Sequence, residues 1–312
     1  MGAHAVEVAE PPNASISQRP EIPLDPPSSV RDAAQYLQCR TTGSEPTRWV
    51  DPRVLWWPPT VVDNRGAGIT IGLLEGDYSP SVADLEGAHI TVRRFGARDN
   101  ASQWLCGHGS FSASLLVGQG SAKLLGTVPA ARLLIACTAS PNGMSQPDTV
   151  AEALTWLAAE GASVIAIPLG QHDEHPGLAD ALCAAADIGA LILAAAGNCA
   201  PRPIMFPARD PHCLAVGACT ATGALLPNCA TSPRLDIIAR GHRVIAPIHD
   251  RAVCRRSGTS ASCVLAAGLI AASISAHGSW SATPTIPADP LSRQHSEPCI
   301  ARKNDETTRR VR

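Results

Sequence analysis

The alternation of short apolar runs with segments of helical spacing limits the folds open to this chain more than any other feature of its sequence. Five runs are apolar almost throughout and each predicts a buried strand: 68–74, 131–138, 163–170, 190–198 and 213–219. Two segments between them, 148–162 and 175–189, carry apolar residues at helical spacing. Continuous apolar strands that alternate with helices predict an α/β fold, a doubly wound, mostly parallel sheet with helices on both faces.

The ends of the chain differ in composition from this central part. Residues 1–45 are rich in Pro, Ser and charge and predict a flexible N-terminal extension. Residues 278–312 hold few large apolar side chains and predict a disordered C-terminal tail. The folded domain is therefore expected to span 46–277. Its last element, from Ser260 to about His277, is apolar on all sides and predicts a central, buried helix.

Charge and cysteine usage narrow the partners and the compartment. A formal net charge of -2 argues against nucleic acid, and no stretch approaches the roughly 18 consecutive apolar residues of a membrane span. We therefore expect neither as a partner. The 11 cysteines are scattered without a CxxC pair, so we expect no metal site and no cofactor. Their odd number and the lack of a secretory signal at the start of the chain favour reduced thiols in the cytoplasm.

Four polar residues stand where the functional residues of a doubly wound sheet usually lie, at the carboxyl ends of strands and the amino ends of helices. Glu75 follows the first predicted strand, and Asn198 ends the fourth. His108 lies between two glycines and opens a stretch of small residues, and Ser260 opens the buried apolar helix. Each alone has an ordinary structural explanation as a turn residue or a helix cap. Their order along one chain carries the functional prediction.

An acid, an imidazole and a hydroxyl in this order fit nucleophilic catalysis by serine. A Ser hydroxyl needs an adjacent base to lose its proton, and the base needs a third group to fix its tautomer. We predict Ser260 as the nucleophile, His108 as its base and Glu75 as the acid that orients the base. Asn198 is the predicted side-chain donor to the oxyanion, and the helix start at Ser260 adds unpaired backbone N–H groups.

The sequence around these residues resembles the subtilase family of serine peptidases over about residues 66–276. GHGS at 107–110 is similar to the family's histidine motif, and SGTSAS at 257–262 is similar to its serine motif. Further similar segments are LILAAAGN, FPARDPHCLAVGA, DLEGAHI, TVPAARLLIA and LDIIARGHRVIAP. The resemblance implies a subtilisin-like fold, cleavage of peptide bonds, and a peptide or precursor protein as substrate.

A narrower resemblance is to the cyanobactin maturation proteases, subtilases that trim precursors of ribosomally made cyclic peptides. It rests on VGQGSAKLLGTVPAARLLI, on the glutamine in PLGQHDE and on LEGDYS after the first strand. It implies that the substrate is a ribosomally made peptide precursor.

Three positions depart from the subtilase pattern. Glu75 stands where the family has Asp, with Asp77 two residues on. Pro168 replaces a Ser of the substrate-binding stretch, and Val264 replaces a Pro in the helix after the nucleophile. These departures keep open an alternative, a catalytically weakened or inactive peptide-binding protein on the subtilase scaffold.

The resemblance also implies the walls of a substrate cleft. Leu169 and Gly170 would pair with the substrate backbone as an added strand, with Pro168 altering that wall. The facing wall would be lined by Ala195, Ala196 and Gly197. Such small side chains would leave space for a sizeable substrate residue before the scissile bond.

Two other α/β functions fit the motifs less well. GQGSAKLLG at 118–126 would be a phosphate loop, but it follows a predicted helix and lacks the Gly-Lys-Ser/Thr ending. An esterase would carry GxSxG around its nucleophile, whereas Ser260 lies in GTSAS.

Overall fold

The computed structural model describes residues 65–95, 107–120, 124–139, 144–232, 235–249 and 252–278. The predicted extension 1–45 and all of the predicted tail after Gly278 lie outside these residues.

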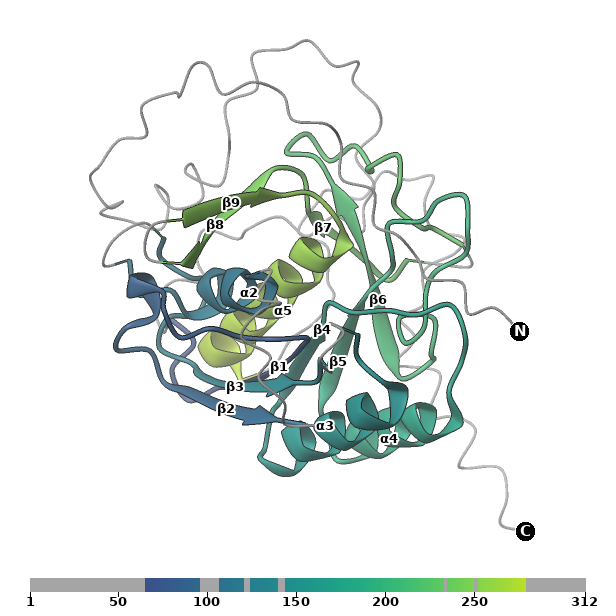
Figure 1. The fold of residues 1–312 in the computed structure, drawn as a ribbon, viewed down its shortest axis with the longest axis horizontal. Helices are drawn as coiled ribbons and strands as arrows, with labels where there is room; N and C mark the ends of the chain where they lie inside the picture. The colour runs from purple at the N-terminus through teal and green to yellow at the C-terminus, as the bar shows by residue number, and fades with distance from the viewer. Residues whose placement is uncertain are drawn as a thin grey trace.

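A seven-stranded sheet runs through the centre of the molecule (Figure 1). Its strands lie in the order β2-β3-β1-β4-β5-β6-β7, and every neighbouring pair is parallel. Their bounds are β1 (Thr70–Glu75), β2 (Ile90–Arg94), β3 (Arg132–Cys137), β4 (Val164–Ile167), β5 (Leu191–Ala195), β6 (Cys213–Cys219) and β7 (Ile237–Arg240). The parallel sheet confirms the predicted fold class.

Helices cover both faces of the sheet and enclose two hydrophobic cores (Figure 1). On one face lie α2 (His108–Val117) and α5 (Thr259–His277), and on the other lie α3 (Pro147–Ala159) and α4 (Pro176–Asp187). Successive residues of β1 show how the strands serve both cores, since Leu73 belongs to the first and Leu74 to the second. This two-sided burial explains the apolar runs in the sequence.

The long helix α5 lies inside the molecule. By length and composition it could cross a membrane, but 67% of its most apolar window is buried in the protein. It packs on β4, β5, β6 and β7 and against α2. α5 is thus the buried core helix expected from its lack of a polar face.

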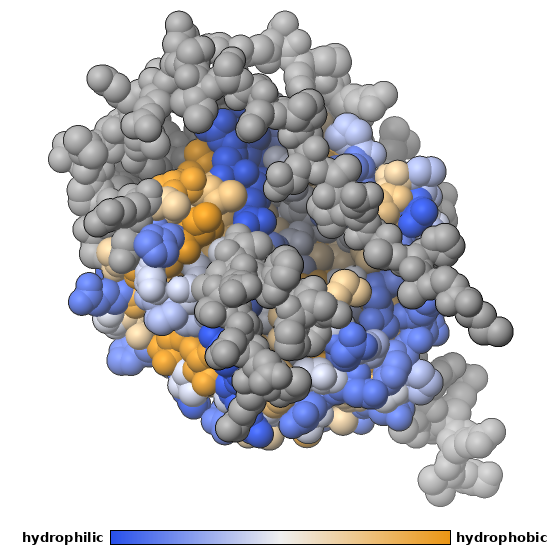
Figure 2. Space-filling model, in the orientation of Figure 1, coloured by the Kyte–Doolittle hydropathy of each residue, from blue (hydrophilic) through white to orange (hydrophobic). Residues whose placement is uncertain are grey.

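The surface differs between the two sides of the sheet. A hairpin of β8 (Val244–His249) and β9 (Ala252–Arg256) lies outside this sheet. In the orientation of Figure 1, hydrophilic residues dominate near α4, whereas hydrophobic residues reach the surface on the side of β2, α2 and this hairpin (Figure 2). Val92 of β2 and Val253 of β9 are among the exposed ones. A short 3-10 helix, η1 (Ala83–Leu85), precedes β2.

The order of the strands fixes where a cleft can form. From β1 the chain crosses to the edge strand β2 and comes back to β3, between β2 and β1. It then passes β1 to β4 and continues to the other edge. The carboxyl end of β1 therefore lies at the reversal point of the winding, which is where doubly wound sheets bind ligands. Glu75 is the last residue of β1.

Candidate active site

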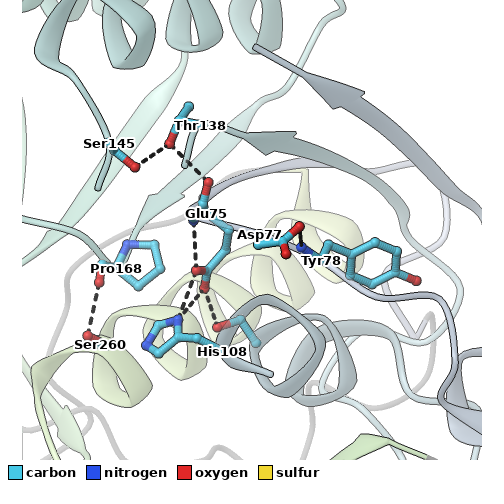
Figure 3. A network of polar contacts seen from close by, with 10 residues as sticks. Glu75, Asp77, Tyr78, His108, Thr138, Ser145, Pro168 and Ser260 are labelled. Carbon is cyan, nitrogen blue, oxygen red and sulfur yellow. Dashed lines mark hydrogen bonds and ion pairs between the residues drawn. The ribbon is translucent and has the colours of Figure 1, made fainter. Parts of the chain in front are cut away.

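Glu75 is held in place through both its backbone and its side chain. Its carbonyl accepts hydrogen bonds from the amide and the hydroxyl of Thr138, at 2.8 and 3.0 Å, and that hydroxyl also contacts Ser145 (Figure 3). The side chain is buried, with 1% exposed. A buried carboxylate is costly unless it is paired, so its neighbours decide whether this arrangement is stable.

His108 supplies the pairing group. Its Nδ1 lies 2.8 Å from Oε2 and 2.9 Å from Oε1 of Glu75 (Figure 3). A carboxylate only accepts hydrogen bonds, so Nδ1 is the donor and Nε2 of the neutral ring is left as an acceptor. The negative charge of Glu75 raises the pKa of His108 above its ordinary value, against smaller opposing effects of burial and of Arg256.

Asp77, the second acid after β1, points away from the imidazole (Figure 3). Its Oδ1 accepts from the amide of Tyr78 at 2.7 Å and from Arg94 at 2.6 Å. Arg94 also donates to the carbonyl of Tyr78. Asp77 therefore belongs to an ion pair that ties the loop after β1 to β2, and only Glu75 contacts His108 among these two acids.

Ser260 lies in the first turn of α5. Its hydroxyl donates to the carbonyl of Pro168 at 2.9 Å. In the view of Figure 3, the ring of His108 lies between Glu75 and Ser260. The structure thus pairs Glu75 with His108 and turns the hydroxyl of Ser260 toward the end of β4.

Asn198 is attached to the same helix start. Its Oδ1 accepts the amide N–H of Thr259 at 2.9 Å, and the hydroxyl of Thr259 accepts from Gly197 at 3.1 Å. Gly258, with a φ of 151°, lies so close that an added Cβ would be 2.8 Å from Nδ2 of Asn198. The amide group is therefore fixed by its oxygen, which directs its N–H groups away from Thr259.

The wall predicted after β4 lies beside Ser260. Pro168 is buried, Leu169 is half-buried and Gly170 is exposed. Gln171 then pairs with Phe206 through two backbone hydrogen bonds, of 2.8 and 2.9 Å. Leu169 and Gly170 come just before this bridge.

The facing wall contains a side chain that the sequence analysis did not consider. Ala195 and Ala196 are buried in opposite cores, and both backbone groups of Ala196 have partners, Val216 and Met205. The side chain of Met205 lies against two glycines. A Cβ added to Gly170 would lie 3.1 Å from Cβ of Met205, and a Cβ added to Gly197 would lie 2.7 Å from Cγ of Met205. Met205 thus fills space between the two predicted walls. Its position after two prolines gave no signal of this contact.

A family model, described as the subtilase family, matches residues 66–286. The chain belongs to the subtilase family. The match continues past residue 277, so the domain boundary placed there stays a prediction.

Curated subtilases resemble this one over most of its length. M-protease of Shouchella clausii (strain KSM-K16) is 26% identical over 281 residues, which cover 86% of this chain and 71% of that protein. Subtilisin Savinase of Lederbergia lenta is 26% identical over 219 residues, which cover 69% and 80% of the two chains.

Solved structures show the same fold. The patellamide maturation protease PatA superposes with a TM-score of 0.60 at 25% identity, covering 70% of this subtilase and 82% of that chain. The prenylagaramide maturation protease PagA gives a TM-score of 0.61 at 24% identity, covering 72% and 81%. This subtilase is therefore structurally close to peptide maturation proteases.

Sequence reasoning also missed a residue that contacts Glu75 in this subtilase. The hydroxyl of Ser112, on α2, donates to Oε1 of Glu75 at 2.6 Å. The available signal was its position four residues after His108, because residues at this spacing share one face of a helix.

Proposed function

We propose that this subtilase is a serine endopeptidase in which Ser260 is the nucleophile, His108 its base and Glu75 the acid that orients the base. One observation carries the proposal: the buried carboxylate of Glu75 lies 2.8 Å from Nδ1 of His108. Holding the proton on Nδ1 leaves Nε2 as the proton acceptor, which a serine nucleophile requires. The extra methylene of Glu, compared with Asp, is accommodated in this geometry.

The residues would act in two steps of acyl transfer. Oγ of Ser260 bonds to the carbonyl carbon of the scissile peptide while its proton passes to Nε2 of His108. The C–N bond then breaks, and the amine leaves with that proton. Water bonds to the acyl carbon and gives a proton to Nε2, the ester bond breaks, and Ser260 regains its proton. Glu75 stabilises the imidazolium in both steps without itself being protonated.

The negative oxygen formed in each step needs donors. The N–H groups of the Asn198 amide are proposed to supply one, because Oδ1 is already occupied by Thr259. The backbone N–H of Ser260, in the first turn of α5, is proposed to supply another, because the first amides of a helix lack intrahelical partners and that of Thr259 is already bonded to Asn198. Together they would bind charge that develops on the substrate carbonyl.

The hydroxyl of Ser260 must turn from Pro168 before it can donate to His108. Its hydrogen bond to the Pro168 carbonyl is an ordinary neutral one of 2.9 Å, and such bonds contribute only about 0.5–1.5 kcal/mol net. This hydrogen bond is therefore only a small obstacle to rotation of the Ser260 side chain.

We propose a peptide precursor as the substrate, in line with the maturation proteases PatA and PagA that share the fold. Leu169 and Gly170 would pair with its backbone as an added strand, and Gly197, with the backbone of Ala195 and Ala196, would form the facing wall. Met205 narrows the space between Gly170 and Gly197. The small wall residues alone predicted space for a sizeable residue before the scissile bond, but Met205 occupies part of that space. We therefore propose a small residue there, and Met205→Gly should shift cleavage toward large apolar residues in a peptide library. An unchanged preference would show that Met205 lies outside the cleft.

Covalent labelling with a fluorophosphonate tests the proposed nucleophile. Wild-type protein should be labelled on Ser260, and Ser260→Ala should lose both labelling and peptide hydrolysis while keeping its fold by circular dichroism. Ser257→Ala is the matched control, since Ser257 lies in the same motif and its hydroxyl accepts only from the backbone of Arg243 at 2.9 Å among the described contacts. Labelling of another serine in Ser260→Ala would refute the assignment.

A peptide-binding protein without catalysis is the second candidate. The observation that favours it is the hydroxyl of Ser260, which donates to Pro168 and not to His108. Such a protein would bind peptides but would ignore the fluorophosphonate. The labelling experiment therefore separates the two functions.

We also propose that the protein works in the cytoplasm with reduced thiols. Cys137, Cys213 and Cys263 are buried free thiols, and burial raises the pKa of Cys137 to about 12, which keeps this thiol protonated and unreactive. Intact mass after alkylation in denaturant should show mostly free thiols, and several complete disulfides would contradict the proposal.

A further inference from the structure

Ser112 is a buried hydroxyl with an unusual partner. It lies within α2, one helical turn after His108, and its side chain is 1% exposed. A serine inside a helix commonly returns its hydroxyl to the carbonyl four residues earlier. Here Oγ instead donates to Oε1 of Glu75 at 2.6 Å. The short distance is typical of a hydroxyl that donates to a charged carboxylate.

The carboxylate of Glu75 has few other contacts that fix its rotation. Nδ1 of His108 lies almost equally far from its two oxygens, at 2.9 and 2.8 Å, so this contact does not select one orientation of the carboxylate plane. The amide of Gly76 approaches Oε2 at 3.3 Å, which is a long hydrogen bond. Ser112 is the partner that distinguishes Oε1 from Oε2 at short range.

A glutamate needs such a partner more than an aspartate does. Its side chain has one additional torsion, and each free torsion lowers the fraction of time spent in the productive geometry. His108 and Ser112 stand at positions i and i+4 of one helix and therefore approach the carboxylate from the same rigid element. A single helix thus presents both the base and the group that aligns its acid.

We infer that Ser112 is a positioning residue that fixes the carboxylate of Glu75 against His108 and so allows a glutamate to act as the orienting acid in this site. The inference rests on the proposed function of Glu75 and His108. Ser112 itself contacts neither the substrate nor the reacting atoms; it acts through Glu75.

The first test compares Ser112→Ala with Ser114→Ala in steady-state hydrolysis. Ser114 is equally buried on the same helix, but its hydroxyl donates to the carbonyl of Pro247 at 3.3 Å. Ser112→Ala should lower kcat about 10-fold, the effect of losing one hydrogen bond to a charged group, with KM changed less than about twofold. Ser114→Ala should leave kcat within about twofold. Equal values of kcat for Ser112→Ala and wild type would overturn the inference.

The second test asks whether the effect of Ser112 depends on the longer side chain of glutamate at position 75. Glu75→Asp removes the additional side-chain torsion that Ser112 is inferred to hold. Ser112→Ala should therefore change kcat less than about twofold in the Glu75→Asp background, although it costs about 10-fold in the presence of Glu75. A 10-fold loss in both backgrounds would show a general structural role and would overturn the inference.

A readout that needs no turnover separates this inference from the proposed function. The imidazole of His108 can be titrated by NMR in wild type, Ser112→Ala and Ser114→Ala. A loosened carboxylate holds the imidazolium less well, so the pKa of His108 should fall toward its ordinary value in Ser112→Ala alone, and an unchanged pKa refutes the positioning role. Failure of fluorophosphonate labelling in wild type would refute the proposed function while leaving this titration decisive for Ser112.

Discussion

The two faces of the sheet carry helices that differ in how they begin. On one face, α2 and α5 each follow a glycine, Gly107 with a φ of 67° and Gly258 with a φ of 151°. On the other face, α3 and α4 each begin with a proline, Pro147 and Pro176. Proline suits the first position of a helix because the lost N–H has no intrahelical partner there. Glycine instead permits backbone angles and close approaches that other residues disfavour.

The difference follows from what each helix start must contact. A Cβ at Gly107 would lie 2.7 Å from Cβ of Ile248, and one at Gly258 would lie 2.8 Å from Nδ2 of Asn198. Behind these starts, residues 109–117 of α2 are all buried, whereas α3 and α4 each bury one side only. Helices fixed on every side hold their first residues rigidly, as a catalytic site requires. Catalysis is proposed on the face that carries α2 and α5, here called the glycine-led face. The face that carries α3 and α4, the proline-led face, supports it.

Removing the charge of Glu75 should give the largest effect on the glycine-led face. Glu75→Gln keeps the size of the side chain but lets its amide favour the wrong tautomer of His108, and kcat should fall about 10⁴-fold, as in the comparable acid-to-amide change of another serine protease. The measurement is peptide hydrolysis beside thermal unfolding, since the fold should persist.

Asp77→Asn is the control for this change, because it alters the other acid after β1, whose partner is Arg94. It should leave kcat within about threefold, the loss expected for an exposed ion pair, and Glu75→Asp should retain substantial activity. If Asp77→Asn were the damaging variant and Glu75→Gln harmless, the assignment of the acid would be wrong.

Truncating Asn198 should give the next largest effect. Asn198→Ala removes one donor to the oxyanion, so kcat should fall by about 10²–10³ with little change in KM. The change also frees the amide of Thr259, which Asn198 now accepts. If instead the free energy of unfolding fell in step with activity, Asn198 would be a structural residue of the α5 turn, and the contrast between the two faces would be one of stability alone.

The sequence predicts the interior of this molecule better than its edges. β3, β4, β5 and β6 each fall within a predicted apolar run, and β1 does so except for its last residue, Glu75, because every strand inside the sheet is buried on both faces. β2 escaped prediction because four of its five residues are exposed at the sheet edge. The hairpin of β8 and β9 lies outside this sheet. β9 ends in two arginines and has two exposed residues, so it gave no continuous apolar signal, and the apolar run of β8 contains Pro247, which argues against a strand inside a sheet.

The residues of the candidate site could be proposed from the sequence, but their contacts could not. Glu75, His108, Asn198 and Ser260 stand at element boundaries, which the sequence pattern marks. Their separations depend on the packing of elements far apart in the chain. For that reason the contacts of Ser112 with Glu75 and of Met205 with the two glycines, like the rotation of Ser260 toward Pro168, needed the structure.

The pH dependence of kcat/KM should show a smaller but directional effect of the charges around His108. The base acts only when neutral, so activity is lost as the pH falls through the pKa of His108. Because Glu75 raises that pKa, the acid limb should lie above the ordinary value of about 6.5.

Two variants should move this limb in opposite directions. Arg256 lowers the pKa of His108, so Arg256→Gln should shift the limb to higher pH. Glu75→Gln should shift the limb of its residual activity to lower pH. A limb that stays in place in both variants would mean that another group controls activity.

The smallest effect on catalysis should come from a cavity on the proline-led face. Leu154 of α3 is completely buried in the core between α3, α4 and the sheet, and Leu154→Ala should destabilise the fold by about 2–5 kcal/mol. That core does not include α2 or α5, whose first residues form the proposed site. At a temperature where the variant remains folded, kcat should therefore stay within about twofold of wild type. Chemical denaturation and steady-state kinetics on the same preparation measure the two quantities. A loss of kcat that matches the loss of stability would mean that the sheet transmits packing changes to the site, and the two faces could then no longer be treated as separate in function.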